Sequence, residues 1–311
     1  MSSDELRIDL EGLVKRYGEN RALDGLSLGV RAGEIFGLIG PDGAGKTTAM
    51  RITCGLVLPD RGSARVMGFD CTTEARRVKE HLGYMPQRFS LYPDLSVAEN
   101  IRFFAELYAV GGEERRAQEA RLMQFSGLGP FRNRRAGALS GGMKQKLALC
   151  CTLIHTPKVL VLDEPTTGVD VVSRAEFWRI LTGLAADGLT LLVSTPYMDE
   201  ALSFHRVALM HGGRAIALGT PEDITGRFDR QLLEVGGRDM DRARRELVRS
   251  DLAGVEVHRF GDRLHVVYDT DAQRGGIRQA LEGLEVAVGP VRPDIEDAFV
   301  SLVTRPPGGS G

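Results

Sequence analysis

The sequence predicts an α/β fold with a parallel sheet at its core, joined to a smaller α+β region. Three near-continuous apolar runs, at 34–40, 158–163 and 189–195, have the length and composition of strands that are buried on both faces. Segments with helical patterns separate these runs, and a parallel sheet needs such crossovers between its strands. We therefore expect an α/β domain over residues 1–225.

A helix-rich insertion interrupts this alternation between the first run and the second. Residues 97–110 have their apolar side chains at helical spacing, and the segment 113–125 is predicted as a second helix. A third helix is predicted at 142–155. We assign about 90–155 to a helical subdomain.

A smaller region is predicted after residue 225. Short strands and helices alternate in it, at 232–235, 241–249, 263–269 and 274–283. We expect a small α+β domain over 226–304. The last residues, 305–311, are rich in glycine and proline and are predicted to form a disordered tail.

The composition is ordinary for a soluble globular protein, with 42% hydrophobic and 26% charged residues. The formal net charge of −2 gives no sign of a basic, duplex-binding surface, so we expect no nucleic-acid partner. No apolar stretch approaches the roughly 18 residues that a membrane-spanning helix needs. The acidic start lacks a secretion signal, so we expect a cytoplasmic protein that contacts a membrane only through partners.

The cysteines show no pattern of a metal site. None of them forms a CxxC pair or has a histidine at zinc-site spacing. We expect reduced, mostly buried thiols at Cys54, Cys71, Cys150 and Cys151.

A glycine-rich loop with the sequence GPDGAGKT occupies 40–47, directly after the first apolar run. It fits the pattern GxxxxGK[ST], in which glycines let backbone N–H groups close around phosphate oxygens. The helix that follows directs its positive N-terminal end at the same phosphates. Lys46 adds a positive charge near the β- and γ-phosphates, and the Thr47 hydroxyl can bind Mg²⁺. The alternative is an ordinary Gly-rich turn, which the placement between strand and helix disfavours.

Two carboxylates, Asp163 and Glu164, end the second apolar run. The carboxyl ends of parallel strands form the sheet edge at which ligands bind. Asp163 is predicted to hold Mg²⁺ there, and Glu164 to orient or deprotonate an attacking water. A strand ending in acidic turn residues is common by itself, but together with the phosphate loop the pair predicts nucleotide hydrolysis.

The segment 139–147, LSGGMKQKL, lies between these two sites and resembles the signature sequence of ABC ATPases. Other motifs of that family then appear in order. Tyr17 is placed like the aromatic residue that stacks on adenine, and Gln87 like the glutamine that contacts Mg²⁺ or the attacking water. Asp170 is placed like the aspartate of the loop that joins two active sites. The structural alternatives are a half-buried aromatic at Tyr17 and a polar turn residue at Gln87.

The resemblance covers residues 6 to about 224 and implies a P-loop ABC ATPase cassette. Such a cassette has a mostly parallel sheet core, an antiparallel β subdomain and a helical insertion, and it binds ATP and Mg²⁺. The implied nucleotide-binding residues are Tyr17, Gly40, Pro41, Asp42, Gly43, Ala44, Gly45, Lys46, Thr47 and Thr48. The implied catalytic residues are Glu164, Gln87 and Lys46, and the implied Mg²⁺ ligands are Thr47, Gln87 and Asp163.

The signature opens the helix predicted at 142–155, whose N-terminus is a second anion site. Within one fold these amides lie too far from the phosphate loop to reach the same ATP. The resemblance implies that they close over the nucleotide of a partner, in a homodimer or in a heterodimer with a related ATPase. The residues implied to act across the dimer are Ser140, Gly141, Gly142 and Gln145.

The motifs GPDGAGKTT, LGYMPQRFSLY, LSGGMKQKL and YMDEA look most similar to those of ABC-2-type exporter ATPases, with multidrug-efflux members nearest. The resemblance implies a motor on the inner face of the plasma membrane that drives a separate ABC-2-type permease. It places substrate selectivity largely in the permease. The region after Gly226 resembles small C-terminal extensions of exporter ATPases, whose role is dimer support, regulation or packing.

One position departs from the family pattern. After the run 189–195 the family has a histidine that reaches the γ-phosphate, but this chain has Pro196, which offers no donor. His205 and His211 lie nearby, and we expect both to be structural or surface residues. A slow or non-hydrolytic regulatory ABC module is therefore the alternative function. A third hypothesis, a soluble ABC ATPase of translation or DNA repair, is disfavoured by the single phosphate loop and the lack of sustained heptads.

Overall fold

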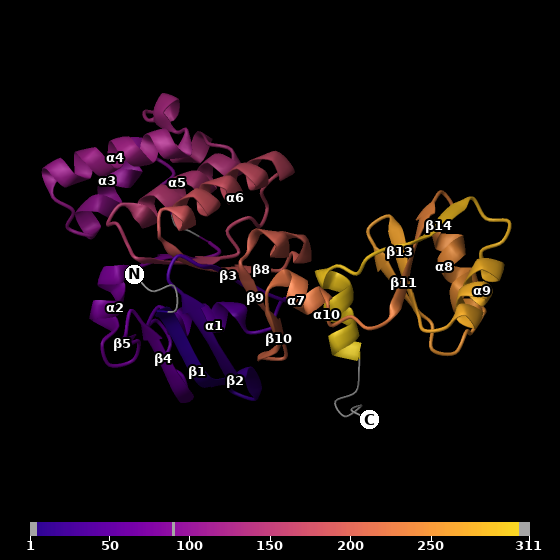
Figure 1. The fold of residues 1–311 in the computed structure, drawn as a ribbon. Helices are drawn as coiled ribbons and strands as arrows, with labels where there is room; N and C mark the ends of the chain where they lie inside the picture. Colours follow the sequence, from indigo (N-terminus) through magenta and orange to yellow (C-terminus); the bar gives the residue numbers. More distant parts are fainter. Residues whose placement is uncertain (1–4, 89–90, 305–311) are drawn as a thin grey trace. The chain divides into compact units, whose positions relative to one another are not determined.

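The structure is a computed structural model that describes residues 5–88 and 91–304. The chain divides into two compact units, Met1–Pro221 and Glu222–Gly311 (Figure 1). The described part of the first unit contains two sheets and that of the second unit contains one, and each unit has its own hydrophobic core. Among the described residues, no helix is both long enough and apolar enough to cross a membrane. The tail predicted at 305–311 lies outside the described residues.

A six-stranded sheet forms the centre of the first unit. Its spatial order is β10 (Arg214–Gly219), β9 (Arg206–His211), β3 (Ile35–Ile39), β8 (Thr190–Thr195), β7 (Val159–Asp163) and β6 (Leu82–Met85). All neighbours in this sheet are parallel except β10, which pairs antiparallel with β9. The three predicted apolar runs are confirmed as β3, β7 and β8, and every residue of these strands is buried.

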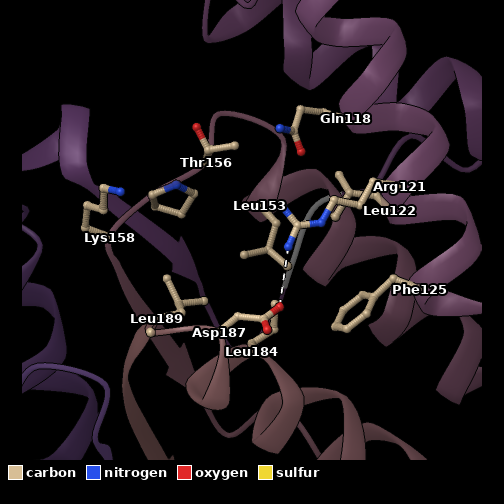
Figure 2. A pocket seen from close by; sticks show the side chains of 12 residues that line it. Gln118, Arg121, Leu122, Phe125, Leu153, Thr156, Lys158, Leu184, Asp187 and Leu189 are labelled. Carbon is tan, nitrogen blue, oxygen red and sulfur yellow. Dashed lines mark hydrogen bonds and ion pairs between the residues drawn. The ribbon is translucent and has the colours of Figure 1, made fainter.

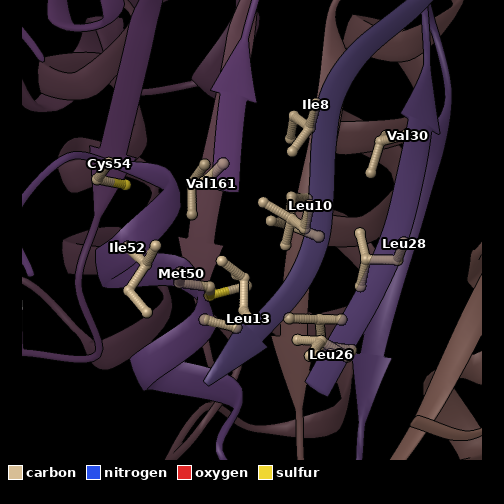
Figure 3. Packing of buried hydrophobic residues seen from close by; sticks show 14 of the residues in the cluster. Ile8, Leu10, Leu13, Leu26, Leu28, Val30, Met50, Ile52, Cys54 and Val161 are labelled. Atoms are coloured by element: carbon tan, nitrogen blue, oxygen red, sulfur yellow. The ribbon is translucent and has the colours of Figure 1, made fainter. Parts of the chain in front are cut away.

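An antiparallel sheet packs against the central sheet through helix α1 (Lys46–Thr53). Its spatial order is β2 (Asn20–Arg31), β1 (Leu6–Tyr17), β4 (Arg61–Val66) and β5 (Phe69–Asp70), and α2 (Ala75–His81) leads from it into β6. Figure 3 shows Met50 and Ile52 of α1 in one cluster with Val161 of β7 and with buried residues of β1 and β2. Because α1 contacts both sheets, the loop before it has a fixed position.

Three helices between β6 and β7 in the chain pack on one another and form the predicted insertion (Figure 1). They are α3 (Val97–Leu107), α4 (Gly112–Ser126) and α5 (Gly141–Leu153), with the short 3₁₀ helices η1 (Gly129–Phe131) and η2 (Ala136–Ala138) between the last two. A capping box of Ser96 and Glu99 starts α3. The helix ends at Leu107, earlier than predicted, because Ala109 takes a left-handed backbone conformation with φ of 56°.

Helix α6 (Val171–Ala186) connects β7 to β8, and the 3₁₀ helix η3 (Met198–Ser203) follows β8. A buried carboxylate, Glu200, joins these segments. Its Oε1 accepts hydrogen bonds from Thr166 Oγ1 at 2.8 Å and from Trp178 Nε1 at 3.1 Å. The segment after β8 is therefore attached to α6 and to the turn after β7. Helix α7 (Pro221–Thr225) follows β10 in the chain.

The four cysteines are free and buried, as predicted. Burial raises the pKa of the Cys71 thiol to about 12 and the pKa of the Cys150 thiol to about 11. These thiols stay protonated at neutral pH and serve as core residues.

The second unit is a four-stranded antiparallel sheet with two helices on one face. The chain order is β11 (Gln231–Gly237), α8 (Met240–Arg249), β12 (Glu256–Phe260), β13 (Arg263–Tyr268), α9 (Asp271–Ala280), β14 (Val286–Pro290) and α10 (Ile295–Thr304). The spatial order β12-β13-β11-β14 is that of a ferredoxin-like split βαβ fold. The predicted β11, α8, β13 and α9 are confirmed, whereas the sequence did not predict β12 and β14.

A buried polar pair joins α10 to this sheet. His265 Nδ1 on β13 lies 2.7 Å from Asp297 Oδ1, and both side chains are buried. Asp297 Oδ2 also accepts a hydrogen bond from the backbone N–H of Asp294, which caps the helix start. Burial raises the pKa of the Asp297 carboxyl, while the bond from Asp294 opposes this effect.

We expect Asp297→Ala to loosen α10 and β13, because it leaves Nδ1 of the buried His265 without its hydrogen-bond partner. Leaving a buried polar group without a hydrogen-bond partner lowers the free energy of unfolding by about 1–3 kcal/mol. Hydrogen exchange should therefore accelerate in the second unit and stay unchanged in β3. Glu282→Ala, at an exposed position of the same unit, is the control. Wild-type exchange in Asp297→Ala would show that the pair does not hold the helix.

Candidate functional site

The phosphate loop lies between β3 and α1, and its glycines are required by close packing. A Cβ atom at Gly40 would lie 2.2 Å from the carbonyl oxygen of Met210. A Cβ atom at Gly45 would lie 2.4 Å from the carbonyl oxygen of Ala22, and the φ of Gly45 is 101°. Only glycine tolerates both the contact and the backbone conformation at that position. The GPDGAGKT pattern therefore has a structural basis at its first and last glycines.

Lys46, the first residue of α1, has its ammonium group inside the loop. The side chain is 4% exposed, and Nζ donates to the carbonyl oxygens of Gly40 at 2.7 Å and Pro41 at 3.1 Å. Nζ also lies 3.4 Å from Glu164 Oε1. The loop thus has a fixed positive charge at its centre, next to the carboxylate of Glu164, the residue that directly follows β7.

Asp163 is the last residue of β7 and is 1% exposed. Its Oδ1 accepts a hydrogen bond from Thr47 Oγ1 at 3.1 Å and another from Ser194 Oγ at 2.7 Å. The hydroxyl after the loop lysine and the carboxylate at the end of β7 are thus in contact, although 116 residues separate them.

Both carboxylate oxygens of Glu164 contact neighbouring side chains. Oε1 faces Lys46, and Oε2 accepts hydrogen bonds from Gln87 Nε2 at 2.8 Å and Thr167 Oγ1 at 3.3 Å. The backbone of Glu164 is left-handed, with φ of 49°. Of the three residues predicted to be catalytic, Lys46 and Gln87 therefore both contact Glu164, through different carboxylate oxygens.

A cavity of about 360 Å³ opens over these groups. Tyr17, at the end of β1, is 48% exposed on its rim, and Lys15 Nζ lies 5.6 Å from the centre of the Tyr17 ring. The residues that line it are Tyr17, Asn20, Ala22, Asp42, Gly43, Ala44, Gly45, Lys46, Thr47, Thr48, Gln87 and Glu164. Nearly all of the predicted nucleotide-binding residues surround this one space.

Two of the predicted signature residues line a different cavity, of about 480 Å³. Ser140 caps α5, and its Oγ accepts a hydrogen bond from the backbone N–H of Met143 at 3.3 Å. Gly141 and Gln145 line this second cavity, and Gln87 lines both cavities. Gly142 has a packing role, since a Cβ atom there would lie 2.5 Å from Cβ of Ser173 on α6.

Asp170 is the N-cap of α6 and lines neither cavity. Its Oδ1 accepts a hydrogen bond from the backbone N–H of Ser173 at 2.9 Å. Hydrogen bonds from Ser173 lower the pKa of the Asp170 carboxyl. The residue therefore stays ionised and holds the start of α6, whose next two residues, Val171 and Val172, are highly exposed.

Pro196 directly follows β8, and no described histidine lines the phosphate-loop cavity. His205 Nδ1 accepts a hydrogen bond from the backbone N–H of Ile35 at 2.9 Å, so its structural role is confirmed. His211 is exposed at the end of β9. Neither histidine lines the phosphate-loop cavity, so neither supplies the hydrogen-bond donor that Pro196 lacks.

The side chains fit a magnesium nucleotide. Thr47, Asp163 and Gln87 offer hydroxyl, carboxylate and amide oxygens, which are the hard ligands that Mg²⁺ prefers. Within the part of the chain that the structure describes, no group of three or more His, Cys, Asp or Glu side chains could hold a metal by itself. Mg²⁺ in such sites is held by one or two protein ligands together with phosphates and water.

A third cavity, of about 220 Å³, lies between α4 and the ends of α5 and α6. Figure 2 shows Arg121 of α4 reaching toward Asp187, with the ion pair at 3.5 Å. Both side chains are largely exposed, so this pair contributes little to stability. None of the predicted site residues line this cavity.

Sequence reasoning missed several neighbours of the site. Asn20 and Ala22 line the phosphate-loop cavity, and the signal for them was the tight turn that follows Tyr17. Ser194 and Thr167 contact the two carboxylates. No local signal marks Ser194, because its position depends on which strand lies beside β7.

Comparison with known proteins agrees with this geometry. The family model described as ABC transporter matches residues 23–167. The chain is 42% identical over 98% of its length to the Escherichia coli protein named "Probable multidrug ABC transporter ATP-binding protein YbhF", and it spans only 52% of that relative. It is 36% identical to a Burkholderia thailandensis protein named "Nod factor export ATP-binding protein I", covering 96% of this chain and 97% of the relative.

A solved structure is similar as well. It is described as the dimeric structure of a post-hydrolysis state of the ATP-binding cassette MJ0796 bound to ADP and Pi. The TM-score is 0.62 at 26% identity, with 68% of this chain and 98% of that chain covered. From the site geometry and these relatives together, we conclude that the chain belongs to the ABC transporter family, among its ATP-binding proteins.

Proposed function

We propose that the chain is the ATP-hydrolysing motor subunit of an ABC exporter. It couples ATP-driven closure of an ATPase dimer to substrate efflux through a separate membrane permease. The observation that supports this most strongly is the convergence of Lys46, Gln87 and Glu164 on one cavity behind a phosphate loop. This set suits phosphoryl chemistry, in which positioning and charge stabilisation account for most of the catalysis.

The loop and α1 would hold the nucleotide. Backbone N–H groups in the second half of the loop, after Pro41, and the N-terminus of α1 would face the phosphates, and Tyr17 at the rim would stack on the base. Lys46 would exchange its bonds to the loop carbonyls for bonds to phosphate oxygens. Thr47, Asp163 and Gln87 would hold Mg²⁺, which neutralises charge on the β- and γ-phosphates when bound.

Glu164 would orient and deprotonate the attacking water. Gln87 and Thr167 fix one carboxylate oxygen, while Lys46 faces the other, so the carboxylate has one preferred orientation. Gln87 also lines the signature cavity. We therefore infer that Gln87 transmits changes at the nucleotide site to the helical insertion. The insertion would in turn transmit them to the permease.

The signature would act on the nucleotide of a second ATPase subunit. Gly141 and Gln145 do not line the phosphate-loop cavity of their own chain, which supports a composite site formed by two chains. Asp170 and the exposed start of α6 are suited to contact the partner. The similar MJ0796 structure is described as dimeric. The partner is a second copy or a related ATPase.

The names of the relatives support export, since one is a probable multidrug ABC transporter ATP-binding protein and another is a Nod factor export ATP-binding protein. We extend this to an ABC-2-type permease as the membrane partner, on the cytoplasmic face of the plasma membrane, without a nucleic-acid partner. The same names favour a transport motor over a regulatory module. Pro196 then affects the rate of hydrolysis while nucleotide binding remains.

We expect Glu164→Gln to bind ATP but to hydrolyse it at least ~100-fold more slowly, because the amide cannot act as a general base. The variant should also accumulate as a closed ATP-bound dimer in light scattering. Glu80→Gln, on the exposed face of α2, is the control and should hydrolyse ATP at the wild-type rate. Wild-type turnover in Glu164→Gln would exclude Glu164 as the essential carboxylate.

The composite-site model is tested with mixed dimers. A Ser140→Arg subunit paired with a Lys46→Ala subunit should keep one intact site, since each change damages a different half. Dimers purified through two different tags should hydrolyse ATP, whereas either variant alone should not. Pairing wild type with a Ser140→Arg/Lys46→Ala double variant should leave no intact site. If the first mixed dimer is as inactive as its parents, the signature does not act in trans.

We expect slow basal turnover in wild type and faster turnover in Pro196→His. One donor at a developing charge is typically worth about 10²–10³-fold in rate. Pro196→Ala is the matched control, because like Pro196→His it releases the fixed φ and restores a backbone N–H, but it adds no side-chain donor. Steady-state ATPase rates, with and without permease, measure the effect. Fast wild-type turnover that neither substitution changes would contradict the proposed role of this position.

A further inference from the structure

We infer that Ser194 is a positioning residue that holds Asp163 and Glu164 in their working arrangement. The inference rests on the proposed ATPase function. Ser194 lies near the end of β8 and is 0% exposed. Its Oγ donates to Asp163 Oδ1 at 2.7 Å and accepts from the backbone N–H of Glu164 at 2.9 Å. The Ser194 hydroxyl thus connects the carboxylate of Asp163, a proposed Mg²⁺ ligand, to the backbone of Glu164, the proposed general base.

The register of the central sheet places this hydroxyl. Ser194 pairs with Asp163 of β7 on one side and with Leu38 of β3 on the other. The N–H of Glu164 also lies 3.2 Å from the carbonyl oxygen of Ser194, which extends the strand pairing past the end of β7. Ser194 therefore links the strand that carries the carboxylates to the strand that carries the phosphate loop.

Glu164 depends on such support because of its backbone. Its φ of 49° lies in the left-handed region, which residues with side chains rarely adopt. Such conformations persist where the surroundings over-determine them, often at active sites. Both acceptors of the Glu164 N–H belong to Ser194. The turn that results directs the Glu164 side chain toward Lys46 and Gln87.

Asp163 depends on Ser194 in a different way. Its Oδ1 accepts hydrogen bonds from the hydroxyl groups of both Ser194 and Thr47. Thr47 is a proposed Mg²⁺ ligand, so Ser194 is the partner that does not belong to the metal site. It fixes the rotation of the Asp163 carboxylate. Groups that orient a ligand in this way typically contribute 10–100-fold to metal affinity or activity.

The alternative is that the Ser194 hydroxyl serves only the stability of the strand. Thr190, in the same strand, provides a matched control for this possibility. It is 1% exposed, and its Oγ1 accepts a hydrogen bond from the backbone N–H of Gly33 at 3.0 Å, at the opposite end of β8. Removing that hydroxyl disturbs the strand without touching either carboxylate.

The experiment compares Ser194→Ala with Thr190→Ala in the full chain. Binding of a fluorescent ATP analogue is titrated in Mg²⁺ and in EDTA, and steady-state ATPase is measured against Mg²⁺ concentration. For Ser194→Ala we expect about a 10–100-fold loss in Mg²⁺-dependent affinity or in kcat. We expect affinity in EDTA to stay within about twofold of wild type, because the phosphate loop is unchanged. Thr190→Ala should show a wild-type Mg²⁺ requirement, even if its melting temperature falls.

A wild-type Mg²⁺ requirement and kcat in Ser194→Ala would overturn the inference, as would an equal change in Thr190→Ala. Ser194→Thr keeps the hydroxyl and should restore the Mg²⁺ requirement at least in part. If Ser194→Ala does not fold, Ser194→Cys, with a weaker donor and a similar volume, replaces it. The binding titration separates this inference from the proposed function. A wild type that binds Mg²⁺ and ATP but never hydrolyses it contradicts the ATPase proposal, while the titration still tests Ser194.

Discussion

The parallel pairing of β3, β8 and β7 is the constraint on which the site depends. It places the carboxyl ends of three strands at one edge of the sheet, where β3 enters the phosphate loop and β7 ends in Asp163. Between them, β8 presents Ser194 to the carboxylates. A shift of one residue in this register would turn each side chain to the other face of the sheet. Contacts between residues more than a hundred positions apart therefore follow from strand order.

Burial of α1 provides the second condition. The helix packs between the two sheets, so the N–H groups at its start and the ammonium of Lys46 cannot move away from the loop. The buried charged groups Lys46 and Glu164 have partners: Lys46 has two carbonyls, and Glu164 has Gln87 and Thr167. In a low-dielectric site such fixed groups act more strongly on bound charge than they would in water. A site of this kind is organised before its nucleotide arrives.

Gln87 lines two cavities, and in the proposed dimer each composite ATP site combines the first cavity of one chain with the signature of the other. The phosphate loop and the carboxylates surround one, and the start of α5 borders the other. Pro196 offers no side-chain donor, while Glu200 attaches the segment after β8 to α6 and to Thr166. That segment thus keeps its anchoring although its first residue offers no donor. The second unit is built separately around its own core, with α10 held by His265 and Asp297.

Local patterns in the sequence determined the fold class, the strands β3, β7 and β8, and the residues of the phosphate loop, because apolar runs, glycine spacing and end-of-strand carboxylates are local signals. They also indicated the helices of the insertion, although the left-handed Ala109 ended α3 early. Tertiary structure alone decided that Ser194 and Thr167 contact the carboxylates and that Gly142 packs on Ser173. It also decided the sheet of the second unit, where β12 and β14 have weak patterns of their own. The physical reason is that these features depend on strand order, which is set by burial and pairing between distant segments, and no window of neighbouring residues contains it.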